Sequence, residues 1–453
     1  MLKKRAHWGS RLAFILAAAG SAIGLGNIWK FPYIAGVNGG GAFVLLYLIC
    51  IFAVGVPILI SEMYIGQKSQ SNNVDAFRKL SENNKWGSMA GWLGLLSAFM
   101  ILSFYSVVGG WILDFEYQSL VSLFSSEPPG FKDGSALGEL LASPERQLLW
   151  HAIFMFLVTW IVYRGVKDGL EKWNKILMPS LFTILVLLFV RCLFLDGIGE
   201  AFSFLFAPNF DQLTADGALE AVGHSFFTLS LGMGVIMVYG SYLDENENLF
   251  KTSIAVAFLD TFIALLAGLV IFSIVFTYGI DPQAGPGLIF GTLPMLLYKL
   301  PGGPFLSVAF FFMITFAAIT SAVSILEVVV AFWDERHEKM SRERASIIVG
   351  FVMFLVGILH VFSTNEWANI FDILGKTNFF DLFDLLTSSY FLPIGGVIIS
   401  LFYGWSLGPK AVENTLGGKS MLFQQGLLWT CRLVAPAMVF AILYTKIMEL
   451  FSS

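Results

Sequence analysis

The chain has 453 residues, of which 57% are hydrophobic and 13% are charged, and its formal net charge is −5. Soluble proteins carry roughly 45–50% apolar and about 25% charged residues, so a soluble globule with this composition could not cover its apolar surface. The composition therefore excludes a cytosolic enzyme and a disordered protein, and the negative charge also opposes nucleic-acid binding. What remains is a polytopic membrane protein.

Eleven runs are long and apolar enough to cross a bilayer as helices, which need about 20 residues each. They lie at residues 11–35, 41–66, 89–121, 147–163, 173–195, 218–242, 252–279, 303–333, 345–363, 379–404 and 423–450. Residues 125–146 are rich in Pro, Gly and Ser and are expected to form a loop. Residues 279–303 are apolar but interrupted by prolines, and they are expected to fold back as a cap. The predicted fold class is an all-α integral membrane protein with 11 transmembrane helices.

The distribution of Lys and Arg predicts the orientation of these helices. With the amino terminus in the cytoplasm, 20 of the 27 Lys and Arg residues fall on the inner side. The positive-inside rule therefore predicts a cytoplasmic amino terminus, and an odd number of spans places the carboxyl terminus outside.

Two spans carry glycines at mid-membrane positions. Residues 20–27 read GSAIGLGN in the first span, and residues 228–234 read TLSLGMG in the sixth. Glycine costs about 1 kcal/mol in a helix interior relative to alanine, and unwound backbone is tolerated in a bilayer only where it lines a cavity or is buried in protein. Interrupted helices that each open a group of five spans predict an inverted repeat with a transporter binding site. The alternative is that the glycines only allow close helix packing.

Five ionisable side chains lie inside predicted spans, where insertion costs about 2.5 kcal/mol or more. They are Lys30, Glu62, Asp260, Glu327 and Asp384. Asp260 is expected to hold a cation or a proton, and Glu62 to accept hydrogen bonds from amides freed by a broken helix. Structural pairing is the alternative for Glu62 and Glu327, and extension toward outer water is the alternative for Lys30 and Asp384.

Small oxygen donors accompany Asp260 in otherwise apolar helices, namely Asn27, Thr228, Thr320 and Ser321. Hard cations bind such oxygens together with freed carbonyls, so the set favours sodium. The alternative for the Thr320-Ser321 pair is that its hydroxyls bond to the preceding helical turn. The five histidines and three cysteines show no metal-ligand spacing, and the sequence contains neither a nucleophile elbow nor a phosphate loop. An enzyme is therefore not expected.

Four stretches resemble the neurotransmitter:sodium symporter family: residues 5–8 (RAHW), 22–33 (AIGLGNIWKFPY), 38–43 (NGGGAF) and 226–232 (FFTLSLG). The resemblance covers essentially the whole chain. It implies the LeuT-type fold, a 5+5 inverted repeat with broken helices 1 and 6. Residues 1–453 would form a single transporter domain, with a first repeat at 11–195, a second at 217–404 and an extra helix 11 at 423–450.

By position, the resemblance implies two co-transported Na⁺ ions and no organic cofactor. The first ion would be bound by the Ala22 carbonyl, Asn27, Thr228 and Asp260, together with the substrate carboxylate. The second would be bound by the carbonyls of Gly20, Ile23 and Ala317 and the hydroxyls of Thr320 and Ser321. Many relatives carry Asn where Asp260 stands, and chloride-dependent relatives bind the anion nearby. A fixed carboxylate therefore predicts chloride independence.

The resemblance also implies a substrate pocket of twelve residues. They are Ser21, Leu25, Gly26, Ile101, Phe104, Tyr105, Phe227, Thr228, Ser230, Met233, Ser321 and Ile325. Amides at the broken turn of the first span and Tyr105 would bind a carboxylate, and carbonyls near Phe227 would bind an ammonium. Monoamine carriers of the family have Asp where this chain has Gly24, so the expected substrate is a zwitterion with an aliphatic or aromatic side chain.

Gates are implied by the same resemblance. On the inner side Arg5 would pair with Glu335 or Asp334, helped by Trp8. On the outer side Phe227 and Tyr105 would close over the substrate, and Lys30 and Asp384 would form a bridge.

Gly169 and Pro179 flank the inner half of the fifth span. Relatives with a Gly-x9-Pro pattern unwind there and let water reach the second sodium. For Pro179 the alternative is a static kink.

The expected function is sodium-coupled import of hydrophobic L-amino acids by alternating access in a bacterial plasma membrane. The expected partners are the amino acid and the lipid bilayer, with no nucleic acid and no obligate protein partner. Proton coupling through Asp260 and a non-transporting amino-acid sensor of the same fold are the alternatives. A channel would need a continuous polar stripe, and a membrane enzyme would need a reactive group facing a cavity.

Overall fold

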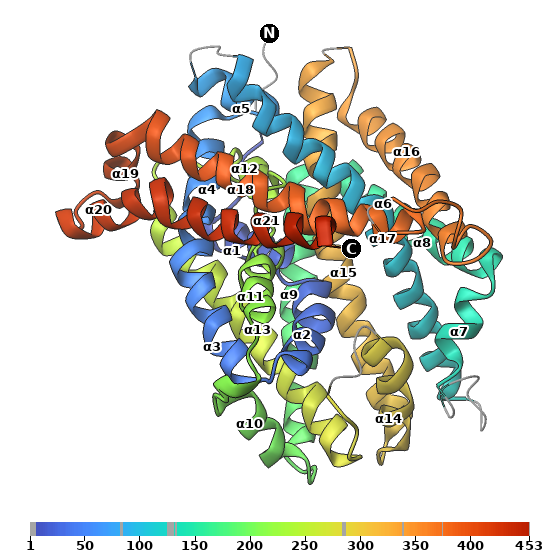
Figure 1. Ribbon diagram of the computed structural model, residues 1–453. Helices are drawn as coiled ribbons and strands as arrows, with labels where there is room; N and C mark the ends of the chain where they lie inside the picture. The colour runs from blue at the N-terminus through green and yellow to red at the C-terminus, as the bar shows by residue number, and fades with distance from the viewer. Residues whose placement is uncertain are drawn as a thin grey trace.

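Apolar runs of the predicted length fold into helices, because a helix satisfies its own backbone hydrogen bonds where water is absent. The computed structural model describes residues 6–81, 85–124, 131, 134–282, 287–337, 339–373 and 375–452. Within these ranges the chain is almost entirely helical, and its β-structure is limited to one isolated bridge between Ile373 and Lys376 (Figure 1).

Nine helices among the described residues are long and apolar enough to cross a membrane. They are Gly41–Ser69, Ser88–Ser122, Pro144–Tyr163, Val166–Cys192, Leu249–Thr277, Gly303–Arg336, Arg342–Ser363, Phe379–Leu416 and Met421–Thr445. A tenth candidate is the bent pair Arg11–Ala22 and Gly26–Val37. The run predicted at 218–242 corresponds to α11 (Ala215–Thr228) and α12 (Val235–Gly240), each too short to span by itself. The count of eleven therefore stays a prediction.

Some of the long helices are single elements, and others join consecutive α-helical and π-helical segments. The segments are α3 (Gly41–Cys50), η2 (Ile51–Gly55) and α4 (Val56–Ser69); α6 (Lys85–Ser122); α8 (Pro144–Tyr163); η3 (Val166–Glu171) and α9 (Lys172–Cys192); α13 (Leu249–Thr277); α15 (Gly303–Arg336); α16 (Arg342–Ser363); α17 (Phe379–Asp384), η6 (Leu385–Phe391), α18 (Leu392–Leu401), η7 (Phe402–Leu407) and α19 (Gly408–Leu416); and α20 (Met421–Trp429), η8 (Thr430–Val434) and α21 (Ala435–Ser452). The shorter elements are α5 (Asn73–Leu80), α7 (Ala136–Leu141), α10 (Ile198–Phe206), η4 (Phe210–Gln212), η5 (Leu288–Thr292) and α14 (Leu293–Lys299).

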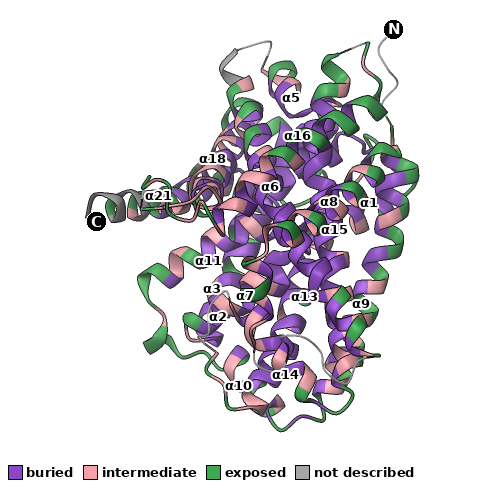
Figure 2. Cartoon of the chain, turned by 90° about the vertical axis from the view of Figure 1, so that its right-hand side faces the viewer, coloured by how far each residue is buried: buried purple, intermediate pink, exposed green. Residues whose placement is uncertain are grey.

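The bundle has a buried centre and a less buried periphery. In the most apolar window of Ser88–Ser122, 89% of residues are buried, against 33% for Val166–Cys192. Figure 2 shows the buried residues gathered along the middle of the molecule, with α21 at one flank. Figure 1 places α5 at one end and α10 and α14 at the opposite end, which we call the α5 end and the α14 end.

Of the two segments expected outside the bilayer, one agrees with its predicted structure and the other does not. Residues 288–299 form a short apolar helix that is below spanning length, in line with a folded-back cap. The segment 125–146 is not simply a loop, because it contains α7 and the start of α8. Residues 125–130 and 132–133 lie outside the described residues.

Candidate functional site

The first glycine-rich stretch breaks its helix. α1 (Arg11–Ala22) ends before Ile23, and the chain resumes as η1 (Gly26–Lys30) and α2 (Phe31–Val37), with a bend of 48° between the halves. A Cβ on Gly24 would lie 2.4 Å from the Ser321 hydroxyl oxygen. Glycine therefore lets this turn approach α15 closely.

The second stretch separates α11 from α12. Ser230, Gly232 and Gly234 have φ values of 54°, 83° and 82°, a left-handed region that favours glycine. The amide of Gly232 donates to Glu62 Oε1 at 2.7 Å, and Glu62 is fully buried. This contact confirms the expectation that Glu62 accepts a hydrogen bond from an amide freed by a broken helix, and it supplies the partner that the helix no longer provides.

Serine hydroxyls join both breaks to α15. Ser230 Oγ donates to the Ser21 carbonyl at 2.9 Å, and Ser321 Oγ donates to the same carbonyl at 3.0 Å. Ser21 Oγ lies 2.7 Å from Ser324 Oγ. The carbonyl left without a helical partner at the end of α1 is thereby satisfied, so three segments far apart in sequence meet at one point.

A cavity of about 20 Å³ lies at this meeting point, and we call it the central cavity. It is lined by Ser21, Ala22, Gly24, Leu25, Gly26, Ile101, Tyr105, Phe227, Ser230, Met233, Ser321 and Ile325. Ten of the twelve residues predicted for the substrate pocket are in this set. The void holds about one water molecule, so a larger ligand requires lining side chains to move.

A second cavity of about 310 Å³, which we call the vestibule, lies toward the α14 end. Its lining comes mainly from η1, α2, α6, η5 and α17 and includes Lys30, Asp384 and Phe104. Leu25, Tyr105 and Phe227 line both cavities and therefore stand between them. Of these two cavities Phe104, which was predicted for the substrate pocket, lines the vestibule and not the central cavity.

The predicted first sodium set converges on Asp260, which is fully buried on α13. Asn27 Nδ2 donates to Asp260 Oδ1 at 2.8 Å, and Thr228 Oγ1 donates to the same oxygen at 3.0 Å. Tyr47 OH donates to Oδ2 at 3.4 Å. Thr228 thus faces Asp260 and is not among the residues lining the central cavity, whereas Ala22 is. These partners are neutral donors, and a buried carboxylate with neutral partners favours a bound cation or proton.

The predicted second sodium set is brought together where α1 meets α15. Ser321 Oγ lies 3.4 Å from the Gly20 carbonyl oxygen, and Thr320 Oγ1 donates to the Ala317 carbonyl at 3.0 Å. Ile23 is the residue at which α1 stops being helical. The set therefore combines two hydroxyls with carbonyls near a helix break, which is a donor set of the kind that hard cations bind.

Trp8, which was predicted to help form the inner gate, is buried. Its indole Nε1 donates to the Tyr239 carbonyl at 3.0 Å, and its ring packs edge-on against Phe14, Tyr239 and Tyr242. Of the proposed inner-gate partners, Arg5 lies outside the described residues. Glu335 Oε2 accepts hydrogen bonds from the backbone amide and side chain of Asn72 at 2.9 and 3.0 Å.

The predicted outer bridge is not formed in this structure. Within the described chain no ion pair links Lys30 and Asp384, although both line the vestibule. Lys30 Nζ lies 4.5 Å from the ring centre of Phe227, and Ser388 Oγ donates to Asp384 Oδ1 at 2.8 Å. A bridge between the two residues stays a prediction for another conformation.

Gly169 and Pro179 both lie in helical backbone. Gly169 is within η3, where a Cβ would stand 2.0 Å from the Ile161 carbonyl oxygen, so the glycine allows η3 to pack closely against α8. Pro179 lies inside α9, which runs uninterrupted from Lys172 to Cys192. The unwinding implied by the resemblance stays a prediction.

Sequence reasoning missed one pair and one lining residue. Glu327 is fully buried and forms an ion pair with Arg342, and it accepts a hydrogen bond from Tyr242 at 2.6 Å, so the structural alternative holds for Glu327. The sequence gives no signal for this pair, because the two residues lie on different helices, α15 and α16, and are not three or four residues apart. Gly24 lines the central cavity, and its place between the glycines of the first break was the available signal.

The chain matches the model of the sodium:neurotransmitter symporter family over residues 5–127 and 143–453. It is 39% identical over 403 residues to the uncharacterized sodium-dependent transporter YhdH of Bacillus subtilis, covering 88% of each chain. It is 26% identical over 471 residues to the human sodium- and chloride-dependent GABA transporter 2, covering 91% of this chain and 76% of the relative.

A solved structure of MhsT in complex with L-phenylalanine superposes with a TM-score of 0.90 at 41% identity, over 98% of this chain and 100% of that one. This match confirms the predicted fold of broken helices in an inverted repeat. The protein is therefore a multi-pass membrane protein that uses sodium. Its family consists of transporters, so it is not an enzyme. The chain belongs to the sodium:neurotransmitter symporter family.

Proposed function

We propose that the protein is a symporter that couples sodium entry to the import of hydrophobic L-amino acids, aliphatic and aromatic, by alternating access. The observation that carries the proposal is the Tyr105 hydroxyl. It is buried, it has no hydrogen-bond partner among the described residues, and its side chain lines the central cavity. A buried unpaired hydroxyl costs about 1–3 kcal/mol, and a substrate carboxylate that accepts its hydrogen would offset that cost.

The rest of the central cavity supports a zwitterion with an apolar side chain. Backbone at two helix breaks offers polar groups, while Leu25, Ile101, Met233 and Ile325 offer an apolar wall. Met233 is unbranched and adapts to side chains of different shape. The solved MhsT structure contains L-phenylalanine, an amino acid that matches this division of polar and apolar groups.

Sodium coupling through two ions is supported by the two clusters of oxygen donors. Two Na⁺ ions that each move down a tenfold gradient and a 100 mV potential release roughly 7 kcal/mol, enough for about 10⁵-fold accumulation of a neutral substrate. In the first cluster the Asp260 carboxylate supplies a fixed negative charge. We propose that this charge makes transport independent of chloride.

The proposal extends to cellular setting and domain organisation. The excess of Lys and Arg on one side favours a cytoplasmic amino terminus and an outer carboxyl terminus. The similarity to a transporter of Bacillus subtilis supports a bacterial plasma membrane. The α5 end would then be cytoplasmic and the vestibule would open to the outside. The whole chain would form one transporter domain with repeats at 11–195 and 217–404.

Uptake into proteoliposomes tests the coupling. Labelled leucine, phenylalanine and tryptophan are supplied with an inward gradient of sodium gluconate or of potassium gluconate, with GABA as the comparison substrate. We expect concentrative uptake of the hydrophobic amino acids in sodium alone and little uptake of GABA. Equal uptake in both salts would contradict sodium coupling and favour protons at Asp260, and sodium-dependent binding without uptake would favour a sensor.

Asp260→Asn tests the role of the carboxylate. Loss of a charged ligand is expected to weaken sodium activation by about 10–100-fold, because hydrogen bonds and ligand contacts of charged groups are worth about 1.5–3 kcal/mol. Replacing gluconate by chloride is expected to restore part of the uptake in the variant and to leave the wild type unchanged. The same chloride response in both proteins would contradict the proposed replacement, and Asp384→Asn is the matched control.

A further inference from the structure

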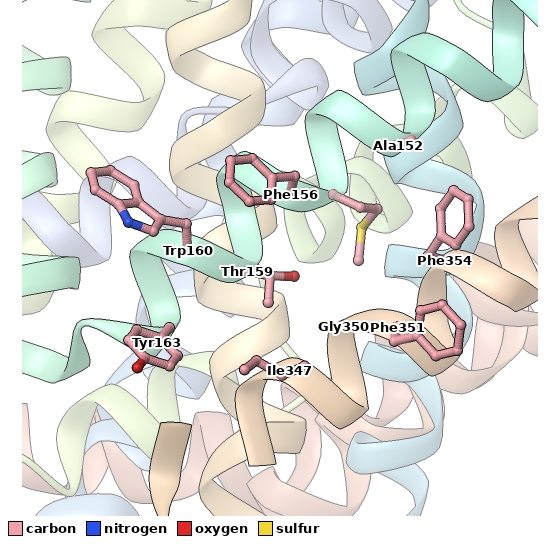
Figure 3. A pocket seen from close by; sticks show the side chains of 10 residues that line it. Ala152, Phe156, Thr159, Trp160, Tyr163, Ile347, Gly350, Phe351 and Phe354 are labelled. Carbon is pink, nitrogen blue, oxygen red and sulfur yellow. The ribbon is translucent and has the colours of Figure 1, made fainter. Parts of the chain in front are cut away.

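An apolar groove between α8 and α16 is unused by the transport pathway. It has a volume of about 530 Å³ and shares no lining residue with the central cavity (Figure 3). Its floor is made by the small residues Ala152, Thr159 and Gly350, and aromatic side chains stand along its edges. Phe156 and Phe351 are 68% and 58% exposed, so the groove opens at the surface of two membrane-spanning helices.

The length of the groove matches half of a bilayer. On α8 it extends from Ala152 to Tyr163, a rise of about 16 Å at 1.5 Å per residue. The hydrocarbon core of a bilayer is about 30 Å thick, so the groove covers the depth of one leaflet. A helix from a second copy of the chain would cross both leaflets, whereas an acyl chain occupies only one.

The residue types at one end of the groove are typical of a membrane–water interface. Trp160 and Tyr163 line this end, and these two residue types concentrate where hydrocarbon meets head groups. The guanidinium of Arg164 lies 5.4 Å from the ring centre of Trp160, and its side chain is exposed. A cation is thereby held at the mouth of an apolar groove.

The charged residues near this mouth have a net positive excess of one. Arg342 is engaged by the buried Glu327, so it leaves little free charge. The other charged residues of segments 163–168 and 342–344 are the cations Arg164, Lys167 and Arg344 and the acids Asp168 and Glu343. An anionic head group is therefore favoured over a zwitterionic one, since each basic residue near the membrane surface contributes to binding acidic lipids.

From these observations we propose that the groove between α8 and α16 is a binding site for an anionic phospholipid. One acyl chain lies between Phe156 and Phe351, and the head group lies against Arg164. The site is separate from the proposed substrate pocket and does not depend on which substrate is transported.

Native mass spectrometry of the full chain in detergent tests this site. The delipidated protein is mixed with dioleoyl phosphatidylglycerol or dioleoyl phosphatidylcholine, which differ only in head group. We expect the wild type to retain phosphatidylglycerol about fivefold better. Arg164→Gln is expected to remove this preference, and Lys410→Gln, which also removes an exposed cation, is expected to keep it. Ala152→Phe fills the groove and is expected to lower retention of both lipids, whereas Leu187→Phe on exposed α9 surface is not.

Three results would overturn the proposal. They are equal retention of both lipids by the wild type, a preference that survives Arg164→Gln, and an equal loss in Arg164→Gln and Lys410→Gln. If Ala152→Phe dissolves a dimer while leaving lipid retention intact, the groove is an interface between copies instead. Because Arg164 is exposed, its variant keeps the test decisive even if Ala152→Phe fails to fold.

Discussion

The protein is built differently on the two sides of the central cavity. At the α5 end the chain is held by buried polar contacts, including Trp8 on Tyr239 and the pair of Arg342 with Glu327. At the α14 end the vestibule reaches down to Leu25, Tyr105 and Phe227, which also line the central cavity. The α5 side is therefore held by a buried hydrogen bond and an ion pair, whereas the lining shared by the two cavities on the α14 side is mainly apolar and aromatic.

This difference bears on alternating access. In the proposed mechanism a substrate from the vestibule would displace a few side chains, whereas release at the α5 end would require several hydrogen bonds and an ion pair to part. The substitutions below weaken one end at a time, and they are ordered from the largest expected effect to the smallest.

Arg342→Met is expected to have the largest effect on stability. The change leaves the fully buried Glu327 carboxylate without its cation, and breaking a buried pair in this way costs about 3–5 kcal/mol. Thermal unfolding in detergent measures the loss. Arg344→Met, two residues away and exposed, is the control and is expected to change stability by less than about 0.5 kcal/mol. Similar losses in both variants would show that the α5 end does not depend on this pair.

Trp8→Ala is expected to loosen the α5 end by about 3 kcal/mol, because a large buried ring and its hydrogen bond to Tyr239 are both removed. Hydrogen exchange of the amides in segment 235–243 is expected to accelerate by a hundredfold or so. Trp8→Phe keeps most of the ring and loses the Nε1 donor, so a smaller acceleration of about fivefold is expected. Unchanged exchange in Trp8→Ala would contradict its role as a closure.

Glu171→Gln is expected to weaken the attachment of the amino-terminal segment by about 1 kcal/mol. Glu171 Oε2 accepts a hydrogen bond from the Gly9 amide at 2.8 Å, and its other oxygen lies 2.5 Å from Lys175 Nζ. The neutral side chain keeps the acceptor but loses the assistance of its charge. Faster exchange of the Gly9 amide measures the effect, and Lys175→Gln separates the ion pair from the backbone contact. No change at Gly9 in Glu171→Gln would show that the charge is irrelevant there.

Asp384→Asn is expected to have the smallest effect on stability, under about 0.5 kcal/mol, because Asp384 forms no ion pair with Lys30 at the α14 end. If the two residues bridge when the vestibule closes, the variant raises the KM for uptake several-fold without changing the melting temperature. A double-mutant cycle with Lys30→Gln measures the coupling. A stability loss as large as that of Arg342→Met would remove the contrast between the two ends.

The sequence alone was sufficient for properties that depend on local composition. Twenty-residue apolar runs form helices in a membrane whatever their neighbours, and glycines at 24, 26, 232 and 234 weaken a helix where they stand. These features, with the family resemblance, predicted the fold that the match to MhsT confirms. The predicted count of eleven crossing helices is not confirmed, because α11 and α12, which correspond to the run at 218–242, are each shorter than a spanning helix.

The tertiary structure decided which side chains face one another. Neighbouring residues on a helix point about 100° apart, so both members of Phe104–Tyr105 or of Phe227–Thr228 cannot face one cavity equally. Tyr105 and Phe227 line the central cavity, while Phe104 turns to the vestibule and Thr228 to Asp260. The pairing of Glu327 with Arg342 likewise depends on how α15 and α16 pack. Local sequence determines where a helix forms and breaks, but the rotation of each helix is determined by its packing against the others.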